Sequence, residues 1–222
     1  MEKAPQGVEI VLKYFADFTP VQLAQFRALY DVYKAHNERI NVISRKDIDS
    51  LYEKHVLHSL SIAAVTEFAP GTSILDIGTG GGFPGIPLAI FFPEVQFLLA
   101  DSIAKKINVV DAVVKELGLT NVVTQNIRVE QIRNQRFDFT ISRAVAPLKE
   151  LWQWSKPLLR KNNPALPRNP GAAQFAPGLI CLKGGDLTQE ISGSGIRPSI
   201  LEITDVFPEG VFKEKFLLYI PA

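Results

Sequence analysis

A chain of 222 residues, 46% of them apolar, can form one large domain, or one domain with a small appendage. The net charge of +1 creates no overall cationic field, so a nucleic acid would have to bind a local basic patch. The single cysteine, Cys181, excludes an internal disulfide and a cysteine-based zinc site, and it fits a reducing compartment. No apolar run approaches the ~20 residues of a membrane span, and residues 1–5 lack the apolar core of a signal peptide, so we expect a cytoplasmic protein.

The beginning of the chain predicts helices. Residues 8–18 carry apolar side chains at helical spacing. Thr19 is suited to cap a second helix, and Pro20 to its first position, where the missing N–H of proline costs nothing. We expect residues 1–70 to form an N-terminal helical extension packed on a core of residues 71–222.

A basic connection, residues 36–46, follows the second predicted helix. It places Arg45 and Lys46 close together beside two asparagines. Two interpretations stay open: a solvated surface loop, and an edge that contacts RNA phosphates next to a cofactor site.

Two histidines, His55 and His58, stand three residues apart after this connection. No third ligand accompanies them, so we expect no metal site. We expect one of them to cap or hydrogen-bond a neighbouring element.

Residues 73–85 combine a short apolar run with a glycine-rich turn. The apolar run predicts a buried strand, and the glycines of 78–82 let the backbone turn tightly and approach a ligand. Pro84 suits the first turn of a helix. A strand, a glycine loop and a helix N-terminus together are typical of a nucleotide-binding site.

The glycine loop matches two patterns. Gly80, Gly82 and Gly85 satisfy the dinucleotide fingerprint, with Asp101 downstream to hold a ribose. The segment that begins at Asp76 also satisfies Asp-x-Gly-x-Gly-x-Gly, which resembles the first motif of the seven-stranded methyltransferases that use S-adenosylmethionine. Asp76 favours the second pattern, because the dinucleotide fingerprint needs no carboxylate inside the strand.

Strand and helix patterns alternate from residue 73 onward, which predicts a parallel sheet covered on both faces. Only residues 207–210 separate the last two strands, so we expect a hairpin with one antiparallel strand at the sheet edge. Such a sheet resembles the class I, Rossmann-like methyltransferase fold in the α/β class; dehydrogenase sheets lack the hairpin. The expected strands cover residues 73–78, 96–101, 121–125, 137–142, 178–183, 199–206 and 215–220, and the expected helices of the core cover 84–92, 104–117 and 147–160.

The ligand of an open α/β sheet lies beyond the carboxyl ends of the strands. This rule places Asp76 and Gly80 at the end of the first strand, and Asp101 at the end of the second, where a carboxylate can accept from both ribose hydroxyls. The fourth strand ends in Ser-Arg-Ala at 142–144, not in the Asn/Asp-Pro-Pro-aromatic motif of enzymes that methylate base amines. Cys181 lies inside an apolar strand and is expected in the core rather than as a nucleophile. Without the amine-methylation motif and without a cysteine nucleophile, the expected methyl acceptor is an atom that is nucleophilic without activation by the enzyme.

Seven segments match the RsmG (GidB) family in order and spacing, and the chain resembles that family over roughly residues 20–190. The family consists of bacterial methyltransferases that use S-adenosylmethionine to modify guanine N7 in 16S ribosomal RNA. The resemblance implies the same cofactor and activity, with 16S RNA or the small ribosomal subunit as partner; we expect a monomer. The matching segments are 41–44, 55–59, 76–89, 101–106, 128–130, 141–144 and 182–185.

The resemblance also implies functional residues. Those expected to line the cofactor site are Gly78, Phe83, Val129, Glu130 and Arg143, beside the residues assigned from the strand ends. Those expected to face the RNA or the methyl-transfer centre are Lys105, Arg128, Arg143 and Lys183, of which we expect Arg143 and Lys183 to act in catalysis. For Arg143, an ion pair with Asp138 or Glu150 is the structural alternative.

Guanine N7 carries a lone pair and no proton, so the expected reaction requires no general base. Catalysis then reduces to holding the reacting atoms in line, and the cofactor brings the electrophile. Two other functions stay open: an NAD-dependent oxidoreductase, and a non-catalytic RNA-binding protein of ribosome assembly.

Residues 161–178, rich in proline, asparagine and glycine, predict a long loop that is either an insertion without function or a lid or RNA contact.

Overall fold

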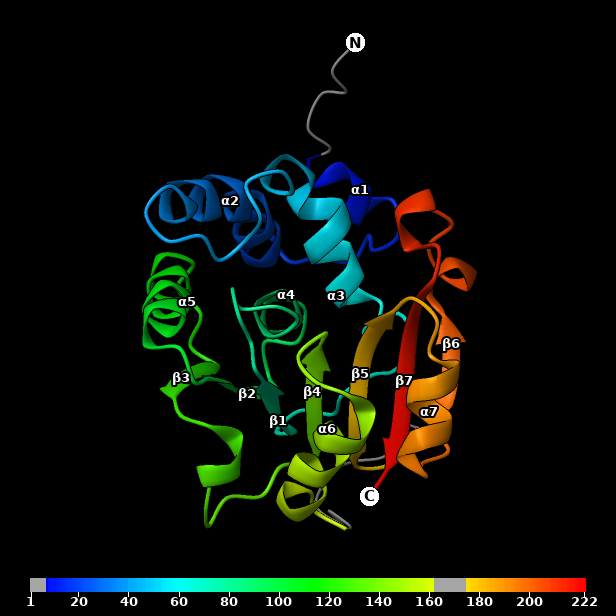
Figure 1. Ribbon diagram of the computed structural model, residues 1–222. Helices are drawn as coiled ribbons and strands as arrows, with labels where there is room; N and C mark the ends of the chain where they lie inside the picture. Colours follow the sequence, from blue (N-terminus) through cyan, green and yellow to red (C-terminus); the bar gives the residue numbers. More distant parts are fainter. Residues whose placement is uncertain (1–6, 162–174) are drawn as a thin grey trace.

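A seven-stranded β-sheet forms the centre of the protein, for which the computed structural model describes residues 7–161 and 175–222 (Figure 1). Its strands are β1 (Ser73–Ile77), β2 (Gln96–Asp101), β3 (Val122–Asn126), β4 (Phe139–Arg143), β5 (Gly178–Gly184), β6 (Ser199–Glu202) and β7 (Lys215–Pro221). Their order across the sheet is β3-β2-β1-β4-β5-β7-β6. Strands β1 to β5 are parallel, which confirms the predicted α/β sheet.

The C-terminal hairpin differs from the prediction in two respects. Strand β7 is antiparallel to both β5 and β6 and lies between them, so the antiparallel strand is not at the sheet edge. Leu217, Leu218 and Ile220 are buried, which suits β7 to the interior, whereas β6 is mostly exposed and forms the edge. The predicted strand 199–206 was also too long, because a 3₁₀ helix begins at Ile203.

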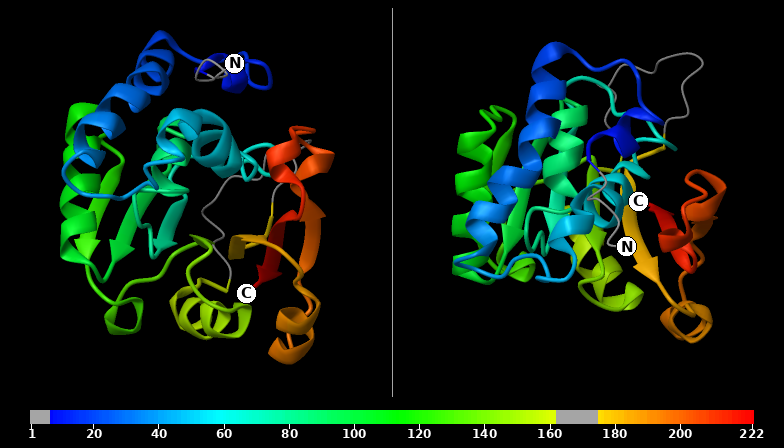
Figure 2. Two further views of the ribbon diagram at one scale, coloured as in Figure 1. Left: turned by 45° about the horizontal axis from the view of Figure 1, so that its top comes forward. Right: turned by 90° about the horizontal axis from the view of Figure 1, so that it is seen from above.

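Helices cover both faces of the sheet (Figures 1 and 2). One face carries α1 (Glu9–Leu12), α2 (Pro20–Asn37), α3 (His58–Leu60), α4 (Gly85–Phe91) and α5 (Ala104–Glu116). The other face carries α6 (Leu148–Ser155) and α7 (Thr188–Ser194). No helix in the described part of the chain is long and apolar enough to cross a bilayer. Most of the predicted loop 161–178 lies outside the described residues.

Apolar side chains alternate between the two faces of each central strand, because successive residues of a strand point to opposite sides. In β1, Ile74 packs under the N-terminal helices and Leu75 packs against the α6 side. In β5, Ile180 packs under the N-terminal helices and Cys181 packs against the α6 side. Cys181 is fully buried, which confirms its place in the core.

Helix α2 begins as the sequence predicts. The Thr19 hydroxyl accepts from the Gln22 backbone N–H at 3.3 Å, and the Gln22 side chain accepts from the Thr19 N–H at 3.0 Å, which forms a capping box. The amide of Gln22 also donates to the carbonyls of Ile90 and Phe91 at the end of α4. One residue therefore caps the start of α2 and joins this helix to the core.

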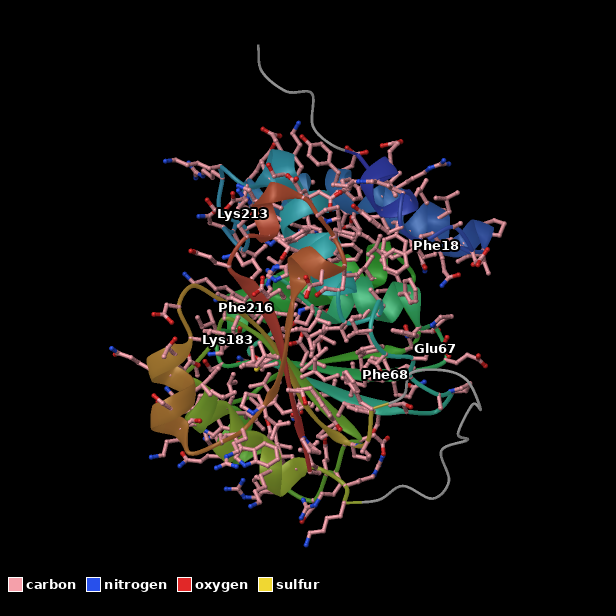
Figure 3. All side chains as sticks on the ribbon, turned by 90° about the vertical axis from the view of Figure 1, so that its right-hand side faces the viewer. Phe18, Glu67, Phe68, Lys183, Lys213 and Phe216 are labelled. Carbon is pink, nitrogen blue, oxygen red and sulfur yellow. The ribbon has the colours of Figure 1, made fainter. Side chains whose placement is uncertain are left out.

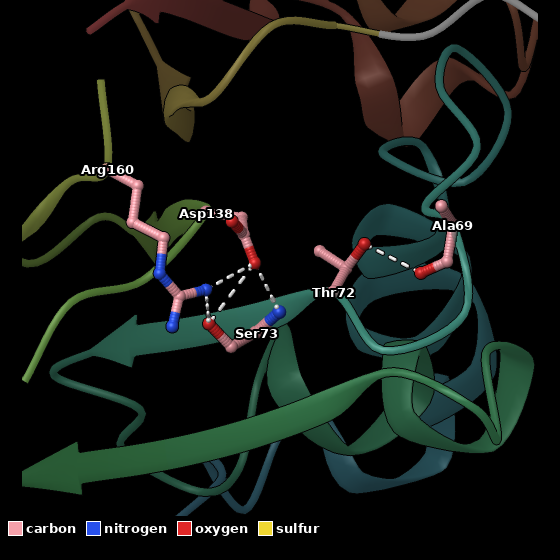
Figure 4. A network of polar contacts seen from close by, with 5 residues as sticks. All are labelled: Ala69, Thr72, Ser73, Asp138 and Arg160. Atoms are coloured by element: carbon pink, nitrogen blue, oxygen red, sulfur yellow. Dashed lines mark hydrogen bonds and ion pairs between the residues drawn. The ribbon is translucent and has the colours of Figure 1, made fainter. Parts of the chain in front are cut away.

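The amino ends of the strands are joined by the buried carboxylate of Asp138 (Figure 4). Its Oδ2 accepts from the Ser73 backbone N–H at 2.8 Å and from Arg160 Nη1 at 2.8 Å. Since Ser73 starts β1 and Asp138 precedes β4, this carboxylate fixes two central strands at the end opposite their carboxyl termini.

Replacing Asp138 with alanine should lower the free energy of unfolding by about 1–3 kcal/mol, because the partly buried Ser73 N–H and the Arg160 side chain lose their acceptor. Urea unfolding measures the change. The exposed Asp17→Ala is the control and should stay within about 0.5 kcal/mol of the unmodified protein. An Asp138→Ala protein as stable as that control would contradict the role given to this carboxylate.

Candidate functional site

A cavity of about 540 Å³ opens at the carboxyl ends of β1, β2 and β4. Its wall is formed by the glycine loop, the end of β2, the segment after β3 and the loop between β4 and α6. The predicted site residues that line it are Gly78, Gly80, Phe83, Asp101, Arg128, Val129, Glu130 and Arg143. Segments from across the core thus meet where the strand-end rule places a ligand.

Asp76 lies beneath the glycine loop rather than on the cavity wall. Its Oδ2 accepts from the Thr79 hydroxyl at 2.7 Å and from the Gly85 backbone N–H at 2.9 Å. The residue is completely buried, and burial raises the pKa of its carboxyl group to about 7. Asp76 therefore ties both ends of the loop to one atom, and we assign it a positioning role instead of direct contact with the cofactor.

The loop backbone needs glycine at two cavity positions. Gly78 and Gly80 have φ values of +64° and +60°, in the left-handed region that other residues rarely adopt. A Cβ at Gly78 would lie 2.7 Å from the Val145 side chain, whereas at Gly80 the nearest atom would be 3.9 Å away. The backbone at Gly80 therefore borders open space, where a ligand can approach it closely.

Helix α2 supports the loop from behind. The Tyr33 hydroxyl donates to the Gly81 carbonyl at 2.7 Å, and its ring lies 5.0 Å from that of Phe83, measured between centroids. The Asn37 side chain accepts from the N–H groups of Val42 and Ile43 at 2.9 Å, which places Val42 on the cavity wall. The contact of Tyr33 with the loop was not predicted from the sequence, because the spacing of this residue fits the apolar stripe of the helix. Its hydroxyl group, which needs a hydrogen-bond partner when buried, was the available signal.

Asp101 occupies the end of β2 as predicted. Its Oδ2 accepts from the Gly80 N–H at 3.0 Å and its Oδ1 from the Ile103 N–H at 2.9 Å. Asp101 is buried among protein atoms, yet it borders the cavity. Each carboxylate oxygen can accept a further bond, so Asp101 can bind a pair of neighbouring hydroxyl groups.

The segment after β3 places Arg128, Val129 and Glu130 on the cavity wall. Arg128, predicted to contact RNA, thus borders the same cavity as the expected cofactor residues. Lys105 is exposed and does not line the cavity, whereas its neighbour Lys106 does. The one-residue difference follows from the helix, which turns successive side chains in different directions.

Arg143 ends β4 and reaches the cavity. Its Nη2 donates to Nδ1 of His55 at 2.9 Å, and its guanidinium carbon lies 5.1 Å from the centroid of the Phe83 ring. The alternative of an ion pair with Asp138 or Glu150 is wrong, because no carboxylate in the described ranges pairs with Arg143. Asp138 binds Arg160 at the other end of β4. The expectation that one histidine bonds a neighbouring element is confirmed by His55.

Lys183 lies at the end of β5 (Figure 3). Its side chain is buried and does not line the cavity. Its Nζ pairs with Glu190 Oε1 of α7 at 2.7 Å and donates to the Ala146 carbonyl. The same Glu190 oxygen accepts from the Leu148 N–H at 2.7 Å. This network holds the loop between β4 and α6, in which Ala144 adopts a left-handed φ of 49°. The geometry does not bring Lys183 into direct contact with a ligand in the cavity.

Arg45 and Lys46 are exposed on the connection that follows α2. Val42 of the same connection lines the cavity, so the two cations stand a few residues from its wall. Within residues 7–161 and 175–222, no group of three or more His, Cys, Asp or Glu side chains could hold a metal ion.

Comparison with known proteins matches residues 22–167 to the family model GidB, described as rRNA small subunit methyltransferase G. The chain belongs to this family. A member from Porphyromonas gingivalis is 50% identical over 219 residues, which cover 98% of this chain and 95% of that protein. A member from Bacteroides thetaiotaomicron is 50% identical over 212 residues, which cover 96% of this chain and 98% of that protein.

The solved structure of a SAM-dependent methyltransferase from Aquifex aeolicus has a similar fold. Its TM-score is 0.52 at 19% identity, over 77% of this chain and 91% of that one. Together with the seven-stranded sheet, this similarity confirms the class I methyltransferase fold expected from the sequence.

Gly80→Ala should weaken the binding of S-adenosylmethionine by about tenfold or more, because the new methyl group enters the cavity. Gly118→Ala is the matched control, since Gly118 has a φ of +64° and open space around it but lies outside the cavity wall. Both variants should lose about 1 kcal/mol of stability from the left-handed backbone. Calorimetric titration and urea unfolding measure the two effects; equal affinity in the two variants would refute this placement of the cofactor.

Lys183→Met should lower the unfolding free energy by about 3 kcal/mol, because it leaves Glu190 without its cation. If Lys183 acts by holding the loop, Glu190→Gln should slow methylation to a similar extent, and the double variant should be no slower than either. Single-turnover rates test this. A Glu190→Gln enzyme at full speed beside an inactive Lys183→Met enzyme would show that Lys183 contacts the substrate itself.

Proposed function

We propose that this protein transfers a methyl group from S-adenosylmethionine to N7 of a guanine in 16S ribosomal RNA. The observation that carries the proposal is the cavity at the carboxyl ends of the strands, bordered by a glycine loop and Asp101, in a chain that belongs to the rRNA small subunit methyltransferase G family. That membership argues against an NAD-dependent oxidoreductase and against a non-catalytic assembly protein.

The residues of the cavity fit the cofactor. Asp101 offers carboxylate oxygens to the two ribose hydroxyls, and Gly80 leaves room for the ligand to approach the backbone. Val129 and the half-exposed Ile103 offer apolar surface to the adenine ring, with Glu130 at its edge. The bound cofactor supplies a methyl group on a positively charged sulfur.

Arg143 is the residue of this site best suited to orient the acceptor. Its guanidinium group keeps donors available for guanine O6, an RNA phosphate or the carboxylate of the cofactor. Guanine N7 has no proton to lose, so we assign no general base. The rate enhancement then comes from holding N7 in line with the methyl group.

The RNA is expected to meet the cavity along basic residues of its rim. Lys106 and Arg128 line the wall, and Arg45 and Lys46 stand on the connection beside it. A protein reads single-stranded or splayed bases of RNA more easily than paired ones, so a loop of 16S RNA is the expected substrate. We further propose that residues 1–70 form a helical extension that carries part of this rim, that residues 71–222 hold the transfer site, and that the chain acts as a cytoplasmic monomer.

The proposal is tested on 16S RNA from a strain that lacks the protein. Purified protein and radiolabelled S-adenosylmethionine should introduce a labelled methyl group into this RNA. Cleavage chemistry specific for N7-methylguanine, followed by primer extension, should then stop at one guanine. Label at a base amine or a ribose would disprove the N7 assignment, and absence of label in naked RNA and in 30S subunits would disprove the activity.

Replacing Arg45 and Lys46 together with alanine should weaken RNA binding and reduce the slope of log K against log salt by about one to two. Affinity for S-adenosylmethionine should not change. The control is Lys156→Ala with Lys161→Ala, which removes two exposed cations that do not line the cavity. If the control pair reduces the slope equally, the effect is one of total charge and not of a defined RNA edge.

A further inference from the structure

The guanidinium group of Arg143 is held by two residues of the N-terminal helical segment that do not line the cavity. Nη2 donates to Nδ1 of His55 at 2.9 Å, and Nη1 lies 3.5 Å from the Lys54 carbonyl. The group also lies over the Phe83 ring, whose centroid is 5.2 Å from that of His55. An arginine has five N–H groups, so donors remain for a ligand in the cavity.

His55 lies in a π-helix, Tyr52–Leu57. A π-helix is rare, and it is frequently found at functional sites. The Ser59 hydroxyl donates to the His55 carbonyl at 2.6 Å, and the Tyr52 hydroxyl donates to the Phe26 carbonyl at 2.7 Å. These bonds fix the turn at both ends, so the direction of the imidazole is set by the fold.

The imidazole accepts this bond as a neutral group. Burial and the neighbouring Arg143 lower the pKa of His55 to about 3, with opposing influence from Asp47. Nδ1 therefore carries the lone pair and Nε2 the proton at neutral pH. A carboxylate in the same place would orient the guanidinium group equally well but would cancel its charge. A neutral acceptor orients Arg143 and leaves that charge available to the cavity.

We propose that His55 is a positioning residue for methyl transfer, which fixes the Arg143 guanidinium group at the cavity wall without neutralising it. The proposal rests on the proposed function, since it assigns Arg143 to the transfer site. It extends the site to the N-terminal segment, where no residue had been assigned to the reaction.

Three variants separate the parts of this role. His55→Asn keeps a neutral acceptor at nearly the same distance from the backbone, His55→Leu removes the acceptor, and His55→Asp keeps the acceptor but adds a negative charge. His58→Leu is the control for damage to the same buried segment, because His58 is buried and the hydrogen bonds of Arg143 go to Lys54 and His55. Single-turnover methylation of 16S RNA at saturating RNA, KM for RNA and Tm are measured on each protein.

The Asn variant should keep the rate within about threefold of the unmodified enzyme, and the Leu and Asp variants should lose about tenfold or more in rate with little change in KM. His58→Leu should lower Tm and leave the rate almost unchanged. Equal rates in the Asn, Leu and Asp variants, or rates that follow Tm in all four proteins, would overturn the role of His55.

A second readout does not depend on activity. Nitrogen-15 spectra of labelled histidine should show His55 neutral and protonated at Nε2 between about pH 5 and 8. A proton on Nδ1 would overturn the proposal even in an active enzyme. An unmodified protein that has this tautomer but transfers no methyl group would instead refute the proposed function.

Discussion

The site depends first on the buried carboxylate of Asp76. A single oxygen accepts from the Thr79 hydroxyl and from the Gly85 N–H, so it joins the start of the glycine loop to the start of α4. Removing it would leave two buried donors unpaired, which costs more than the bonds themselves contribute. The loop in turn presents the Gly80 N–H to Asp101 at the end of β2. The shape of the cavity therefore follows from a residue that does not border it.

The N-terminal segment completes the site instead of only covering the sheet. Tyr33 binds the loop carbonyl of Gly81, Val42 forms part of the cavity wall, and His55 holds Arg143. Its buried side chains belong to the same apolar cluster as those of β1, β2 and α4. A change in the packing of these helices would therefore reach the transfer site through specific contacts.

Local patterns were sufficient to predict the strands, the glycine loop and Asp101, because strand periodicity and turn chemistry depend on neighbouring residues. Local patterns could not place β7 between β5 and β6, because either strand of a hairpin can pair with the neighbouring strand of the sheet. The apolar run of β7 was the available sign that this strand, and not β6, lies inside the sheet. The partners of Lys183 and Arg143 were also missed. For Arg143 the expected partners were acids nearby in the chain, whereas it binds a neutral imidazole far away in sequence. No partner was predicted for Lys183, because its ion pair with Glu190 depends on how α7 packs beside the end of β5.

The central claim is that the cavity at the carboxyl ends of the strands holds S-adenosylmethionine, with its ribose on Asp101. A crystal structure of the protein with this cofactor tests it most directly. We expect electron density for the ligand beside Gly80, with both ribose hydroxyls on the Asp101 carboxylate. Density outside this cavity, or a ribose that does not contact Asp101, would contradict this placement of the cofactor.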